Sequence, residues 1–178
     1  MRLTHDEQYQ LAITNVSSMI DYWPYNEVRT MLDIKNRRMV KRFKRGDKST
    51  VLKQAENMAE MIKRLGYDSP DYTLLCVPAS SEHKHEKRYK LFSNALCMLT
   101  GMTNGYDFVQ VHGKRDAIHK SVGRIIRNND QRICVNECEL YGRNVIIFDD
   151  VITTGKSFAS FALRIEQAGA NVVEGVFL

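Results

Sequence analysis

Residues 144–157 constrain the fold more than any other part of the chain. Four apolar residues at 145–148 run directly into two carboxylates, Asp149 and Asp150. A short loop rich in threonine and glycine follows, and residues 158–168 then show helical periodicity. This order predicts a buried strand, a polar turn and the start of a helix. The carboxyl end of such a strand, facing a helix N-terminus, is where α/β proteins bind phosphorylated ligands.

The loop after the two carboxylates has the chemistry of an anion site. Thr153, Thr154 and Ser157 supply hydroxyl groups, and Gly155 lets the backbone come close to a bound group. The loop N–H groups and the helix dipole favour an anion such as a phosphate monoester. The two carboxylates would repel that phosphate, so we expect them to accept hydrogen bonds from neutral hydroxyls, as carboxylates do with ribose diols. The block therefore predicts a site for a ribose 5-phosphate.

Other interpretations of the block stay open at this point. The tripeptide Gly155-Lys156-Ser157 is similar to the end of a nucleotide-binding P-loop, but that motif requires a glycine where Asp150 stands. An aspartate after a strand could also hold Mg²⁺ in another α/β family. A helix cap without any ligand is the purely structural alternative.

Residues 145–157 resemble the phosphoribosyl-pyrophosphate (PRPP) signature of the type I phosphoribosyltransferases. They match it at every position: an apolar run, two acidic residues, an apolar residue, any residue, Thr-Thr-Gly, any residue and Ser or Thr. The resemblance implies that Asp149 and Asp150 hold the ribose 2- and 3-hydroxyls. It implies that Mg²⁺ is bound mainly through PRPP, with no direct protein ligand. It also implies that the 5-phosphate lies on a loop made of Val151, Thr153, Thr154, Gly155, Lys156 and Ser157.

Two further loops are candidates for the pyrophosphate part of PRPP. Backbone N–H groups of residues 79–81 follow an expected strand that ends at Pro78, and nearby cations could bind the pyrophosphate oxygens. This predicted pyrophosphate loop consists of Ala79, Ser80, Ser81, Lys84 and Arg88. His83 and His85 could instead form a metal pair, although histidines in a charged loop are usually solvated. A third loop, with Lys114, Arg115 and His119, stands where the family has a mobile loop that closes over PRPP; an exposed basic loop without a ligand is its alternative.

The alternation of strand and helix patterns predicts an α/β fold with a mostly parallel, twisted sheet flanked by helices. A helix is expected to begin at a cap formed by Ser49 or Thr50 and to end at Leu65, before Gly66. Residues 34–178 are expected to form the core of the protein. The resemblance implies that this core is Rossmann-like. Residues 1–33 are expected to form a helical N-terminal cap or hood. Further strands are predicted over residues 71–78, 108–111, 133–136 and 171–178.

Composition narrows the class of protein. The 178 residues, 43% hydrophobic and 26% charged, suit one α/β domain with an appendage. The chain shows no apolar run of membrane-spanning length and no signal-peptide pattern at its start, so we expect a cytoplasmic protein without a membrane partner. The four scattered cysteines are expected to be reduced and mostly buried.

A cluster of cations at residues 35–45 indicates either contact with nucleic acid or the solvated face of a helix. Residues 38–44, Val77-Pro78, Arg88-Tyr89 and Asn94 resemble the ComF-like phosphoribosyltransferases, which are linked to DNA uptake. Two features depart from that family. The Arg-Gly-Phe-Asn-Gln stretch is degraded here to residues 88–94, and the cysteine-rich zinc module is absent.

These patterns lead to three expectations of function. The first is a phosphoribosyltransferase, a glycosyltransferase that moves a 5-phosphoribosyl group from PRPP to an unidentified nucleobase or amine with pyrophosphate as the leaving group. The second is a non-catalytic regulator that senses PRPP or a nucleotide. The third is a ComF-like accessory protein in DNA uptake or processing. The family resemblance also makes a homodimer possible.

Overall fold

A computed structural model describes residues 16–20, 30–113 and 131–178. Its main sheet has five strands in the order β1-β7-β6-β2-β3, and every neighbouring pair is parallel. These strands are β1 (Val16–Ser18), β2 (Tyr72–Cys76), β3 (Thr103–Asn104), β6 (Asn144–Asp149) and β7 (Asn171–Phe177). A separate antiparallel pair joins β4 (Val109–His112) to β5 (Arg132–Val135). The expectation of an α/β fold with a mostly parallel sheet is confirmed.

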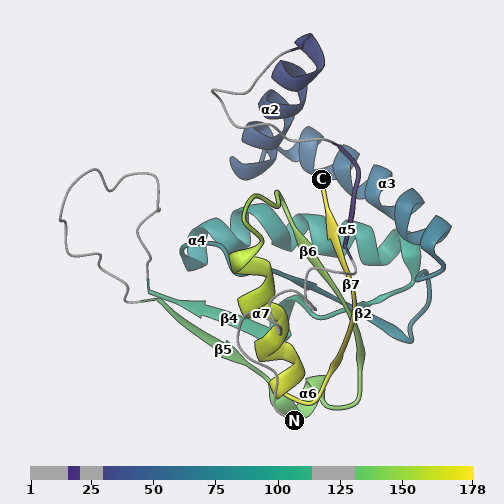
Figure 1. Cartoon of the computed structure of the whole chain (residues 1–178), viewed down its shortest axis with the longest axis vertical. Helices are drawn as coiled ribbons and strands as arrows, with labels where there is room; N and C mark the ends of the chain where they lie inside the picture. The colour runs from purple at the N-terminus through teal and green to yellow at the C-terminus, as the bar shows by residue number, and fades with distance from the viewer. Residues whose placement is uncertain (1–15, 21–29, 114–130) are drawn as a thin grey trace.

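Helices cover both faces of this sheet. Figure 1 shows α7 on one face, with α3 and α5 on the other and α2 at the top of the view next to the start of α3. The helical segments are α2 (Met31–Lys44), α3 (Lys48–Leu65), α4 (Glu82–His85), the π-helix η2 (Glu86–Lys90), α5 (Leu91–Thr100), the 3₁₀ turn η3 (Tyr106–Phe108), α6 (Glu137–Leu140) and α7 (Lys156–Gln167). Among the described residues, no helix has the length and apolar character needed to cross a membrane.

The central strand β6 is apolar on both faces because each face meets a layer of helices. Ile146 and Phe148 belong to the core beneath α3 and α5, whereas Val145 and Ile147 belong to the core beneath α7. Successive side chains of a strand point to opposite faces, so a strand covered on both sides becomes a continuous apolar run. That run is what made β6 recognisable from the sequence.

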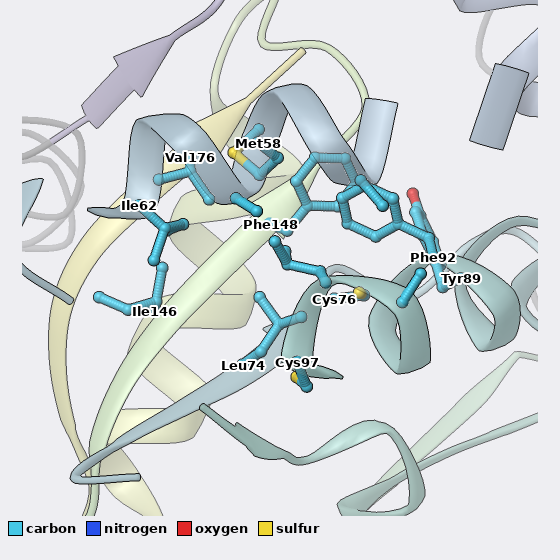
Figure 2. Close-up of a cluster of buried hydrophobic side chains, with 14 of the residues drawn as sticks. Met58, Ile62, Leu74, Cys76, Tyr89, Phe92, Cys97, Ile146, Phe148 and Val176 are labelled. Carbon is cyan, nitrogen blue, oxygen red and sulfur yellow. The ribbon is translucent and has the colours of Figure 1, made fainter. Parts of the chain in front are cut away.

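An aromatic cluster joins α2 and α5 to β6. Phe148 stacks on Phe92 with ring centroids 4.2 Å apart, and it meets Phe43 of α2 edge-on at 5.9 Å. Figure 2 shows Met58 and Ile62 of α3 converging on the same core as Phe92 and Phe148. Aromatic pairs at such spacings stabilise a core beyond the area that they bury. The cluster therefore anchors three separate segments just beneath the end of β6.

The structure corrects several expectations about local elements. Asp47, rather than Ser49 or Thr50, caps α3, because its side chain accepts the Thr50 N–H at 2.9 Å. Gly66 does end this helix, with a positive φ of 78°. The expectation of mostly buried thiols holds for Cys76 and Cys97. It is wrong for Cys134 and Cys138, which are exposed.

The helical cap expected at residues 1–33 is wrong at Val16–Ser18, which form strand β1 of the main sheet. This strand pairs with β7, whose residues lie far away in the sequence, so local periodicity carries no sign of it. Helix α2 begins at Met31 and runs across the expected boundary at residue 33. The division of the chain into a cap and a core stays a prediction, and residues 1–15 and 21–29 lie outside the described residues.

The strand order places a topological switch point between the carboxyl ends of β2 and β6. The chain leaves β2 through α5 to reach β3 on one side, and it leaves β6 through α7 to reach β7 on the other side. The direction of winding therefore reverses between β2 and β6. In open α/β sheets, ligands bind at this kind of topological switch point.

We expect Phe92→Ala to lower the free energy of unfolding by about 3–5 kcal/mol, because it opens a cavity among buried rings. Phe92 is fully buried, whereas Met98 on the same helix is 82% exposed. Met98→Ala, the matched control, should change stability by less than about 0.5 kcal/mol. Urea unfolding of both variants checks the prediction, and equal midpoints would contradict the burial of Phe92 beneath β6.

Candidate functional site

The loops that follow β2 and β6 lie side by side at the carboxyl edge of the sheet. Cys76 pairs with Phe148 in parallel register, and the Val77 N–H donates to the Phe148 carbonyl at 2.9 Å. Residues 77–81 therefore leave the sheet next to residues 149–155. The expected pyrophosphate loop and the expected ribose 5-phosphate block are brought together by this pairing.

Asp150 is a buried carboxylate with a cation on each oxygen. Its residue is 4% exposed. The ammonium of Lys44 lies 3.0 Å from Oδ1, and Nη1 of Arg88 lies 3.2 Å from Oδ2. Lys44 is the last residue of α2, and Arg88 lies in η2. Because a buried charge is costly unless it is paired, these two contacts make the burial of Asp150 possible.

Asp149 accepts two hydrogen bonds on one oxygen. The Tyr89 hydroxyl donates to Oδ1 at 3.3 Å, and the Asp150 N–H donates to the same atom at 2.8 Å. Burial, together with the neighbouring charge of Asp150, raises the pKa of Asp149 to about 7, although both hydrogen bonds and Lys44 act in the opposite direction. Burial also raises the pKa of Tyr89, so its hydroxyl keeps the proton that it donates.

The π-helix η2 brings two successive residues to the two carboxylates. Arg88 contacts Asp150, and Tyr89 contacts Asp149. A π-helix has a wider turn than an α-helix and often occurs at functional sites. Nothing in the local sequence indicates this turn, so the contact of Tyr89 with Asp149 was missed by the sequence analysis.

The loop between β6 and α7 encloses a small cavity of about 50 Å³, which has room for several water molecules or one tetrahedral oxyanion. Gly155, at the N-cap of α7, has a φ of 70°, which a residue with a side chain rarely adopts. Because glycine has no side chain to cap the helix, it leaves the first N–H groups of α7 open to a ligand. The cavity is lined by Asp149, Val151, Ile152, Thr153, Thr154, Gly155, Lys156, Ser157, Phe158 and Phe177.

The loop after β2 is tied down by its own contacts. The N–H of Ala79 donates to Nδ1 of His85 at 3.4 Å, and its carbonyl accepts from Gln131 at 2.6 Å. Lys84 donates to the Ser80 hydroxyl at 3.0 Å. Of the expected pyrophosphate loop, Ala79 is thus engaged within the protein, whereas Lys84 and Ser80 face solvent at least in part. Ser81 is buried and accepts the His85 N–H at 2.9 Å through its carbonyl.

His85 supports this loop as a neutral acceptor. Its ring is buried and stacks on Tyr106 with centroids 5.3 Å apart. Burial and the positive charge of Arg88 lower the pKa of His85 to about 4, so the ring is uncharged near neutral pH. His83 is exposed, and the described residues contain no group of three potential metal ligands. The expected third loop, with Lys114, Arg115 and His119, lies outside the described residues.

The chain matches no protein-family model, and a search of curated proteins finds no significant relative.

Asp149→Asn should change how stability depends on pH. A pKa raised from 3.8 to about 7 means that the folded protein holds a proton which the unfolded chain releases, so stability falls as pH rises through this window. The asparagine variant lacks this dependence, and its stability relative to the wild type should increase from about pH 4 to about pH 7 and then level off. Urea unfolding across the window measures the difference. Asp68→Asn, at an exposed position, is the control, and parallel profiles for all three proteins would refute the raised pKa.

Proposed function

We propose that the protein is a phosphoribosyltransferase that binds PRPP and transfers its 5-phosphoribosyl group to a nucleobase or amine. The observation that carries this proposal is the arrangement at the switch point. A pair of carboxylates ends β6 directly beside a phosphate-sized cavity at the start of α7. Residues 145–157, which provide most of the lining of that cavity, also match the PRPP signature position by position.

Each part of PRPP can be assigned to a group of residues at this switch point. The 5-phosphate is assigned to the cavity at the start of α7, where N–H groups and the hydroxyls of Thr153, Thr154 and Ser157 can donate to it. The ribose hydroxyls are assigned to Asp149 and Asp150, which accept hydrogen bonds. The pyrophosphate then lies toward the loop after β2. Mg²⁺ would be held by oxygens of the ribose and the pyrophosphate, which are its preferred ligand type.

The proposed reaction needs positioning more than a strong catalytic base. The bond between the anomeric carbon and the pyrophosphate oxygen breaks, and the oxygen keeps the electron pair. An acceptor nitrogen bonds to the opposite face of the carbon and releases its proton to solvent. Charge accumulates on the departing pyrophosphate. The cations Lys84 and Arg88 next to the loop after β2 support the stabilisation of that charge.

Release of pyrophosphate from PRPP in the presence of Mg²⁺ and a panel of purines, pyrimidines and amines tests the enzyme directly. We expect Asp150→Asn and Thr154→Val each to weaken PRPP binding by roughly tenfold or more in calorimetry, because each removes hydrogen bonds to the ligand. Asp68→Asn is the control for loss of one exposed carboxylate. Tight PRPP binding without pyrophosphate release for any acceptor would exclude the transferase and favour the PRPP sensor. Unchanged affinity in both site variants would exclude the PRPP site.

A second candidate function, contact with nucleic acid, is favoured by the outer face of α2. With 100° per residue, its exposed cations fall within about one third of the helix circumference, opposite the buried Val40 and Phe43. Arg42 among them forms an ion pair with Asp47 at 2.9 Å. A one-sided row of cations suits a polyanion such as DNA or RNA. The exposed cations are Lys35, Arg38, Lys41, Arg42 and Arg45.

Neutralising this face should weaken nucleic-acid binding and flatten its dependence on salt. The variant Lys35→Gln/Arg38→Gln/Lys41→Gln removes three positive charges, and the slope of log K against log salt should fall by about 0.9 for every phosphate that is no longer neutralised. Fluorescence anisotropy with a labelled oligonucleotide measures both quantities. The control variant Lys53→Gln/Lys63→Gln/Lys90→Gln removes the same charge from other exposed positions. Equal binding by the two variants would show that α2 is only a solvated face.

A further inference from the structure

We propose that Lys44 determines the specificity of this site, because a ribose diol takes its place on Asp150 and the released ammonium pairs with the pyrophosphate of the same ligand. The site then selects a diol that carries an anionic group at the anomeric carbon over the same diol without one. This inference rests on the proposed PRPP site and adds a residue from outside the signature, more than a hundred positions away in the sequence.

The ion pairs of Asp150 leave no oxygen of this carboxylate without a cation. Lys44 holds Oδ1 at 3.0 Å and Arg88 holds Oδ2 at 3.2 Å. Each oxygen has a second lone pair, but the Asp150 side chain is only 6% exposed, so little of it is open to a hydroxyl while both cations are in place. Recognition of a diol by Asp150 therefore requires that one of the two cations moves.

Lys44 is the cation that can move. Its side chain is 38% exposed, whereas that of Arg88 is 19% exposed. Arg88 is also held at a second point, because its Nε donates to the Lys44 carbonyl at 3.3 Å. A lysine has a flexible stem and a single ammonium, so it can exchange partners with little rearrangement of the backbone. The backbone of Lys44, at the end of α2, stays in place under this exchange.

The exchange couples the two ends of the ligand. An ammonium that leaves Asp150 gives up a short charge-assisted interaction, and a new anion in reach compensates for it better than water does. The loop after β2, where the pyrophosphate is assigned, lies beside Arg88 and Asp150 through the pairing of β2 with β6. PRPP supplies the new anion there, and ribose 5-phosphate does not. Ribose 5-phosphate must therefore break the ion pair with only hydration of the ammonium as compensation.

The test compares the affinities of PRPP and ribose 5-phosphate in Lys44→Met, which keeps an unbranched side chain one atom shorter and removes its charge. Calorimetry with Mg²⁺ should show weaker binding of PRPP and tighter binding of ribose 5-phosphate. The preference for PRPP should thus fall by roughly tenfold or more, the scale of one charge-assisted hydrogen bond. Lys48→Met removes the same charge from an exposed position four residues later and should leave the preference unchanged.

A second comparison separates the exchange from a loss of folding. The preference is a ratio measured on the same folded molecules, so partial unfolding lowers both affinities equally. In an Asp150→Asn background, Lys44→Met should no longer improve the binding of ribose 5-phosphate, because no ion pair remains to be broken. An unchanged preference in Lys44→Met, with PRPP bound by the wild type, overturns this inference alone. A wild-type protein that does not bind PRPP overturns the proposed function as well.

Discussion

The arrangement of the segments around the end of β6 depends on the burial of one carboxylate, Asp150. A buried carboxylate is costly unless cations or hydrogen-bond donors compensate for its lost hydration. Lys44 and Arg88 provide that compensation from two different segments. The end of α2 and the π-helix η2 are therefore held at the carboxyl edge of β6. Under the proposed exchange, the same ion pairs also decide what a ligand must displace.

Charged residues of the candidate site stand next to aromatic residues of the core in the sequence. Phe43 precedes Lys44, Tyr89 follows Arg88, and Phe148 precedes the two carboxylates. The rings of Phe43 and Tyr89 lie 5.9 and 6.0 Å from that of Phe148. Each charged group of the candidate site is thus adjacent in sequence to an aromatic residue of the packed core beneath it. Such packing limits the movement of the backbone and leaves the long cationic side chains as the adjustable parts.

The two carboxylates at the end of β6 have different environments. Asp150 is paired with two cations, whereas Asp149 has a tyrosine hydroxyl and a backbone N–H, with a pKa raised to about 7. Perturbed carboxylates in a crevice cluster at functional sites, because a ligand supplies the interactions that the protein itself lacks. The two carboxylates accept hydrogen bonds from a ligand. The neighbouring cavity at the start of α7 instead favours an anion, because its N–H groups donate hydrogen bonds. A ligand with both hydroxyls and a phosphate suits this contrast.

The sequence by itself determined the strand from residue 145, the loop that follows it, the start of α7 and the α/β class. Each of these is encoded locally: by an apolar run, by residues with special turn chemistry, or by a helical period. Tertiary structure alone decided that Lys44 and Arg88 meet Asp150, that Tyr89 meets Asp149 and that residues 16–18 join the sheet. Periodicity shows which face of an element a residue occupies. It does not show which distant segment that face will contact, because strand order and the π-turn of η2 depend on packing across the whole chain.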